Sequence, residues 1–250
     1  MTGPSQPMAI LDRTLQILTE GELRLRGFLA NASNHTLLCQ VGPAEDGMHA
    51  VYKPSSGEQP LWDFPTGTLC RREVAAYVVS RALGWDLVPA TVLRDGPLGP
   101  GSVQLFIAHD PRLHYFVLVQ DERFHPELAR MALFDLLTNN TDRKGSHVLL
   151  DQDADRLYGI DHGVTFHPQP KLRTVIWELG GTPLQGEWRR DLKRLAEQLV
   201  REEDPLVQEL CSLLSPREVA VTATRARALS RTRALPDVEE EQRPYPWPPL

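Results

Sequence analysis

The stretch 139-NNTDRKGSHVLL-150 decides how this sequence is interpreted, because it gathers four charged or titratable side chains in one turn. The turn lies between a segment with a helical apolar pattern, 126–139, and a short apolar strand, 147–150. Asp142 is followed by Lys144 two positions later and by His147 five positions later. Two interpretations are open: a surface loop with an ordinary Asx turn, or a catalytic loop for phosphoryl transfer in which one metal ligand has been replaced.

A second acidic residue follows at a position that fits phosphoryl transfer. Expected strands at 147–150 and 157–160 lead the chain to 160-IDHG-163, so Asp161 follows a strand as the metal-binding Asp of kinases does. In kinases the loop Asp orients the attacking hydroxyl, and an Asn five residues later binds a second magnesium ion. His147 occupies the position of that Asn here.

The patterns on either side of this loop predict an α+β fold with two lobes around a ligand cleft. The first half is typical of an antiparallel sheet with one packed helix, and the second half is mostly helical. We expect a disordered N-terminus at 1–8, an N-lobe at 9–108, a C-lobe at 109–234 and a disordered Pro-rich, acidic tail at 235–250. The expected helices are 9–20, 69–83, 126–139, 187–201, 204–214 and 216–229, and the expected strands are 22–29, 36–41, 48–54, 90–94, 102–107, 147–150 and 157–160.

Lys53 ends the third expected strand, and alternation places it on the same face as Val51. An inward-facing lysine needs a carboxylate or an anionic ligand. Glu73, early in the next expected helix, is the candidate partner, because kinases pair a strand Lys with a helix Glu. The alternative is that Lys53 is a solvated strand end and that Glu73 only favours the helix N-terminus.

Several segments together resemble the phosphatidylinositol 3-/4-kinase superfamily. The likeness is closest to type II phosphatidylinositol 4-kinases and to related bacterial proteins, and it extends over about residues 20–200 in collinear order. It implies a bilobal protein-kinase-like fold with ATP in the cleft. The segments that carry it are 50-AVYKPSSGEQPLWDFP-65, 69-LCRREVAAYVVSRALGWDLVPATVL-93, 99-GPGSVQLFI-107, 138-TNNTDRKGSHVLL-150 and 159-GIDHGVTFHP-168.

The resemblance implies a role for each matching residue. Asp142 is then the catalytic base or hydroxyl orienter, Lys144 contacts the γ-phosphate, and Asp161 is the main metal ligand. Lys53 binds the α-phosphate and is held by Glu73. The linker around Gln104, Leu105, Phe106 and Ile107 contacts adenine, and Ser33 and Asn34 in the 30–36 loop form an anion-binding nest over the phosphates.

The departures from the family pattern leave alternatives open. Imidazole is a poorer ligand for Mg²⁺ than an amide oxygen but suits Mn²⁺, so His147 either completes a metal site with altered preference or hydrogen-bonds to Asp142 or phosphate. A nucleotide-binding pseudokinase or scaffold is the competing class. AMP transfer, with the nucleotide reversed in the cleft, is a further enzymatic alternative.

The resemblance implies ATP and Mg²⁺ or Mn²⁺ as cofactors, with a hydroxyl group on a lipid, protein or small molecule as the acceptor. A net charge of -6 gives no reason to expect nucleic acid binding. Three scattered cysteines and the lack of an apolar run of about 18 residues predict a cytoplasmic protein without a membrane anchor. A protein partner is left open. Trp62, Trp177 and Trp188 are expected to pack in the core, the alternative being a surface platform.

Overall fold

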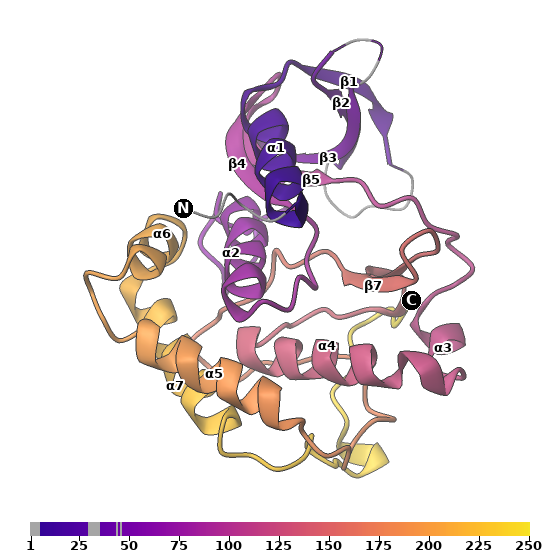
Figure 1. Cartoon of the computed structure of the whole chain (residues 1–250), viewed down its shortest axis with the longest axis vertical. Helices are drawn as coiled ribbons and strands as arrows, with labels where there is room; N and C mark the ends of the chain where they lie inside the picture. The colour runs from indigo at the N-terminus through magenta and orange to yellow at the C-terminus, as the bar shows by residue number, and fades with distance from the viewer. Residues whose placement is uncertain (1–5, 30–35, 44, 46) are drawn as a thin grey trace.

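The computed structural model describes residues 6–29, 36–43, 45 and 47–250, which form a sheet-containing N-lobe above a helical C-lobe (Figure 1). This arrangement confirms the expected α+β fold. Most elements begin and end within three residues of their expected bounds, because their apolar periodicity is strong. The first helix starts at Gln6, inside the stretch expected to be disordered.

The N-lobe sheet is antiparallel throughout, in the order β1-β2-β3-β5-β4. Alternation along β3 buries Ala50 and Tyr52 completely and leaves Lys53 half-buried on the other face. The strand that carries Lys53 lies in the middle of the sheet, so its backbone is paired on both sides. The five strands are β1 (Leu23–Phe28), β2 (Leu37–Val41), β3 (Met48–Pro54), β4 (Thr91–Gly96) and β5 (Gly99–Leu105).

Two helices pack in the N-lobe. Helix α1 (Gln6–Glu20) contacts β4, and α2 (Leu69–Leu83) contacts both β4 and β5 and then the C-lobe helices. Gly84 caps the C-terminus of α2 in a left-handed conformation (φ 72°). This conformation lets the Gly84 and Trp85 N–H groups donate to carbonyls of the last turn. Because α2 contacts the sheet and the C-lobe at once, its side chains set how the two lobes meet.

The C-lobe is built around α4 (His125–Thr138), whose Leu128, Leu133 and Phe134 are fully buried. Pro126 occupies the first turn, where its missing N–H is not needed. The other elements are α3 (Tyr115–Leu118), the hairpin β6 (Val148–Asp151) and β7 (Arg156–Gly159), α5 (Gly186–Gln198), α6 (Pro205–Leu213), α7 (Pro216–Leu229), and the 3₁₀ turns Ser55–Gly57, Glu122–Phe124, Gly145–His147 and Glu240–Gln242. Among the described residues, no helix has the length and apolar character needed to cross a membrane.

The segment 235–250, expected to be disordered from its composition, lies along the C-lobe. Leu235 is buried, the Pro244 carbonyl accepts the Thr174 N–H at 3.2 Å, and the Pro249 carbonyl accepts the Gly145 N–H at 2.8 Å. Proline carbonyls are good acceptors although proline lacks an N–H. Composition does not reveal these bonds, because they depend on main-chain groups supplied by the C-lobe.

A buried ion pair joins the two lobes. Arg72 of α2 donates to the Glu218 carboxylate on α7 at 2.6 Å and to the Thr165 carbonyl at 2.7 Å. The other Glu218 oxygen accepts the Ser215 N–H and closes the capping box of α7. Both charges are almost completely removed from water, so each depends on the other for compensation.

We expect Glu218→Gln to lower the free energy of unfolding by about 3 kcal/mol, because it leaves the buried Arg72 charge uncompensated. The matched control is Glu209→Gln. It breaks the ion pair between Arg81 of α2 and Glu209 of α6, whose side chains are 41% and 44% exposed. That change should cost less than about 1 kcal/mol. Urea denaturation of both variants measures the difference, and equal losses would contradict a special role for the buried pair.

Candidate active site

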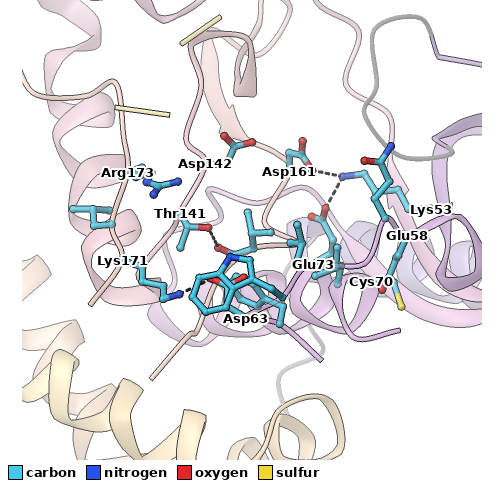
Figure 2. Close-up of a pocket in the computed structure, with 18 of the residues that line it drawn as sticks. Lys53, Glu58, Asp63, Cys70, Glu73, Thr141, Asp142, Asp161, Lys171 and Arg173 are labelled. Carbon is cyan, nitrogen blue, oxygen red and sulfur yellow. Dashed lines mark hydrogen bonds and ion pairs between the residues drawn. The ribbon is translucent and has the colours of Figure 1, made fainter. Parts of the chain in front are cut away.

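The Lys53 ammonium joins the N-lobe sheet, helix α2 and the C-lobe. Its Nζ lies 2.5 Å from Glu73 Oε1 and 2.9 Å from Asp161 Oδ1 (Figure 2). Burial opposes the charge, but the two carboxylates raise the pKa of Lys53 above its ordinary value. Lys53 is therefore a fixed cation with two anionic partners, and the expected pairing with Glu73 is present.

Glu73 is held in the first half of α2, where both carboxylate oxygens have partners. Oε1 accepts from Lys53, and Oε2 accepts the backbone N–H of His162 at 2.9 Å. Burial raises the pKa of this carboxyl above its ordinary value. Through these two bonds, a displacement of α2 would disturb both the Lys53 ammonium and the backbone next to Asp161.

Asp161 lies just beyond β7 in the left-handed backbone region, with φ 60°. Aspartate tolerates this conformation better than most residues, and such positions concentrate at functional sites. Burial alone would raise the pKa of the carboxyl, yet the adjacent Lys53 ammonium holds it well below its usual range. The site therefore presents an ionised carboxylate, which is the ligand type that Mg²⁺ and Mn²⁺ prefer.

Asp142 faces the same region from the 139–147 loop. Its N–H is bound by the Asn140 side-chain oxygen at 3.0 Å, and its Oδ2 lies 3.6 Å from Lys144 Nζ. Burial and, to a lesser degree, the negative charge of Asp161 raise the pKa of Asp142 to about 6. A carboxylate with a raised pKa can accept a proton near neutral pH more effectively than an ordinary Asp.

A buried hydrogen-bond hub behind the loop fixes this arrangement, and the sequence interpretation did not assign it. The Arg143 guanidinium is fully buried, forms a bidentate pair with Asp135 of α4, and donates to the carbonyls of His147 and Ile160. Ile160 directly precedes Asp161, so one guanidinium holds the backbone at both ends of the site. An Asp in the apolar helix pattern of 126–139 was the signal that could have identified it.

His147 lies between the loop and Asp161. Its Nε2 is 3.2 Å from Asp161 Oδ2, and its Nδ1 accepts the Lys144 N–H at 3.4 Å. Burial, aided by nearby cations, lowers the pKa of His147 to about 4, so the ring is neutral at pH 7. With Nδ1 accepting, the single ring proton sits on Nε2 and faces Asp161.

A cavity of about 890 Å³ opens beside these residues (Figure 2). Lys53, Glu73, Asp142 and Asp161 line one part of it. The rest is lined by the 58–64 loop, the first turn of α2, the segments 163–164 and 170–173, and Pro244. Its volume is in the range of small-molecule sites.

The residues expected to contact adenine do not line this cavity. Gln104 is buried in β5 and donates to the Thr91 hydroxyl at 2.8 Å. The Phe106 N–H donates to the His49 carbonyl at 3.0 Å, and the buried Ile107 offers its carbonyl to the His109 ring. Ser33 and Asn34, expected to form an anion-binding nest, lie outside the described residues. Among the described residues, the candidate site included, no cluster of three or more His, Cys, Asp or Glu side chains is close enough to hold a metal ion.

Arg143→Lys should lower the free energy of unfolding by about 3 kcal/mol, because an ammonium cannot replace the forked guanidinium among several buried acceptors. Arg173→Lys is the matched control. Arg173 forms a backbone bond with Arg143, but its side chain is exposed, and its replacement should change stability by less than about 0.5 kcal/mol. Urea denaturation distinguishes the two, and a tolerant Arg143→Lys variant would contradict the assignment of Arg143 as the hub.

Solved structures with a similar fold include a protein kinase. The Golgi casein kinase matches with a TM-score of 0.57 and 13% identity, covering 91% of this chain and 74% of that chain. The Golgi casein kinase with Mn/ADP bound has a TM-score of 0.57 and 13% identity, covering 97% of this chain and 81% of that chain. Hydra Fam20 with sugar has a TM-score of 0.57 and 13% identity, covering 91% of this chain and 88% of that chain. At this identity the likeness establishes the protein-kinase-like fold of the chain and nothing about its chemistry.

A curated relative has much higher sequence similarity. Protein Rv2133c of Mycobacterium tuberculosis is 38% identical over 274 aligned positions, which cover 96% of this chain and 97% of the relative. No protein-family model matches the chain. At this identity and coverage, the chain belongs to the family of Mycobacterium tuberculosis Rv2133c.

Proposed function

We propose that this protein is an ATP- and divalent-metal-dependent phosphotransferase that acts on a hydroxyl group. The observation that carries the proposal is the pair of contacts from Lys53 to Glu73 and Asp161, with Asp142 facing the same cavity. Active kinases need the Lys–Glu ion pair and the metal-binding Asp in place at the same time. The Lys53–Glu73 pair and the position of Asp161 beside it support the proposal on both counts.

Asp142 is the proposed base or hydroxyl orienter. Its pKa of about 6 leaves it ionised at neutral pH but still able to take a proton from the acceptor as the bond to phosphorus forms. Lys144, 3.6 Å from Asp142, is the proposed contact to the γ-phosphate. Lys53 is the proposed contact to the α-phosphate, where its permanent charge offsets that of the nucleotide.

Asp161 is the proposed main metal ligand, and its ionised carboxylate fits Mg²⁺ or Mn²⁺. A bound metal would neutralise charge on the nucleotide phosphates. His147 is the proposed second ligand, and its imidazole suits Mn²⁺ better than Mg²⁺. Coordination through Nε2 would require the ring proton to leave that nitrogen. The Mn/ADP complex of the structurally similar Golgi casein kinase is consistent with this choice of nucleotide and metal.

The adenine-binding role of Gln104, Phe106 and Ile107, and the phosphate-binding role of Ser33 and Asn34, remain predictions. So do the finer assignment to the phosphatidylinositol 3-/4-kinase superfamily and a cytoplasmic location. A lipid acceptor rests only on that resemblance. We therefore propose the type of reaction alone, and experiment must identify the acceptor as a lipid, a protein or a small molecule.

Variants of the proposed metal and phosphate contacts should lose activity, whereas replacement of an exposed lysine should not. Asp161→Asn should lower ATP consumption at least a hundredfold, because charge stabilisation at the metal contributes several kcal/mol to such reactions. Lys53→Ala should behave similarly. Lys193→Ala is the control, since that lysine is exposed on α5. Equal rates of ATP consumption in all of these proteins would contradict the site assignment.

The rate should also depend on pH through Asp142. The carboxylate accepts a proton only when ionised, so activity should be full above pH 7, half-maximal near pH 6, and about tenfold lower for each further unit of acid. Initial rates between pH 5 and 8 measure this, with thermal melting at each pH to exclude unfolding. A flat profile would contradict a role for Asp142 as the base.

A nucleotide-binding pseudokinase is the second candidate, and the contact between His147 Nε2 and Asp161 favours it. In the tautomer described, Nε2 carries the proton and has no lone pair for a metal. His147→Asn separates the two functions. Under the phosphotransferase proposal, this variant keeps its activity or uses Mg²⁺ better. A pseudokinase would show an ATP-induced rise in melting temperature in the wild type and no phosphate transfer with either metal.

A further inference from the structure

We propose that the acceptor is a small hydroxyl compound carrying an anionic group, either a phosphate or a carboxylate, and that Arg173 binds this group in the cavity beside Asp142. This inference rests on the proposed phosphotransferase function and adds a substrate class to it. Arg173 acts as a specificity-determining residue.

The cavity lies where an acceptor is needed. Asp142 and Asp161 line it, whereas the linker expected to contact adenine does not. A nucleotide bound between that linker and Lys53 would leave the cavity free on the other side of the reacting phosphate. The acceptor hydroxyl must approach Asp142 to be oriented, and this cavity gives it access to that carboxylate.

Arg173 is held next to Asp142 by its own backbone. Its N–H donates to the Asn140 carbonyl at 2.9 Å, and its carbonyl accepts the Arg143 N–H at 3.1 Å. Figure 2 shows its side chain on the same side of the cavity as Thr141 and Asp142. A cation anchored to the loop of the proposed base can fix the distance between an anionic group and the reacting hydroxyl.

Arg173 also differs from the two lysines that line the cavity, because they are paired with carboxylates and, among the described residues, its guanidinium is not. Lys53 is bound by two carboxylates, and Lys171 lies 2.5 Å from Asp63 Oδ2. In the described part of the chain, the Arg173 guanidinium has no hydrogen bond or ion pair with another side chain. Acidic residues outnumber basic ones around the cavity, with Asp63, Glu73 and Asp161 paired to the two lysines. An anionic ligand therefore has one free guanidinium to contact, and this fork suits phosphate and carboxylate.

The mouth of the cavity favours a small compound. The Lys171–Asp63 ion pair joins two of the segments that line the cavity, 170–173 and the 58–64 loop (Figure 2). Trp62 at this rim is 93% exposed, contrary to the expected core packing, and Lys171 Nζ lies 4.6 Å from its ring centroid. Trp177 and Trp188 are buried as expected. An exposed indole beside a polar cavity offers a flat contact for a ring or carbon chain.

The test measures how inorganic phosphate and acetate raise the melting temperature of the full chain. Saturating ADP with Mn²⁺ fills the nucleotide site, and NaCl keeps the ionic strength constant. The proteins are the wild type, Arg173→Gln, Arg173→Lys and Arg217→Gln. Arg217 is the matched control, because it is an exposed arginine on α7, away from the cavity.

We expect at least one anion to bind the wild type with a Kd on the order of 1 to 10 mM and to bind Arg173→Gln at least tenfold more weakly. Arg173→Lys should retain part of the affinity, and Arg217→Gln all of it. Binding of phosphate points to a phosphorylated acceptor, and binding of acetate alone to a hydroxy acid.

The outcome for this inference is separable from the outcome for the proposed function. ADP with Mn²⁺ is titrated first, and a wild type that binds no nucleotide contradicts the proposed function together with this inference. If ADP binds but neither anion binds, or if Arg173→Gln binds both as the wild type does, only the anionic acceptor is overturned.

Discussion

The buried pair between Arg143 and Asp135 is the interaction on which the rest of the site depends. The Asp135 carboxylate is fully buried in α4, and the guanidinium that neutralises it reaches the backbone carbonyls of His147 and Ile160. A buried pair of this kind adds little net stability compared with apolar packing, but it tolerates few other arrangements of the chain around it. It therefore fixes the distance between the loop that carries Asp142 and the turn that carries Asp161.

A second set of bonds connects this C-lobe unit to the N-lobe. Lys53 contacts Asp161, Glu73 contacts Lys53 and the His162 N–H, and Arg72 on the same helix contacts Glu218. Helix α2 thus takes part in both the site and the lobe interface. A change in the orientation of α2 would separate the Lys53 charge from Asp161, so the position of this helix would determine whether the site is complete.

Much of the fold was predictable, because it follows from patterns within single segments. The alternation of 48–54 predicted both the strand and the inward direction of Lys53. The kinase-like order of the motifs that carry Asp142 and Asp161 predicted one shared site, and both residues line the same cavity. The hub was not predictable in the same way, since Asp135 and Arg143 meet only when α4 ends in the left-handed Asn139 and the chain turns back. The exposure of Trp62 and the packing of 235–250 likewise depend on distant segments.

We propose above all that Lys53, Asp142 and Asp161 form a nucleotide-dependent phosphoryl-transfer site. The most direct measurement is a crystal structure of the full chain with ADP and Mn²⁺. The account predicts the metal on Asp161, the nucleotide phosphates within hydrogen-bond distance of Lys53 Nζ, and the cavity beside Asp142 still open. A nucleotide bound away from Lys53 and Asp161, or an adenine ring filling that cavity, would contradict it.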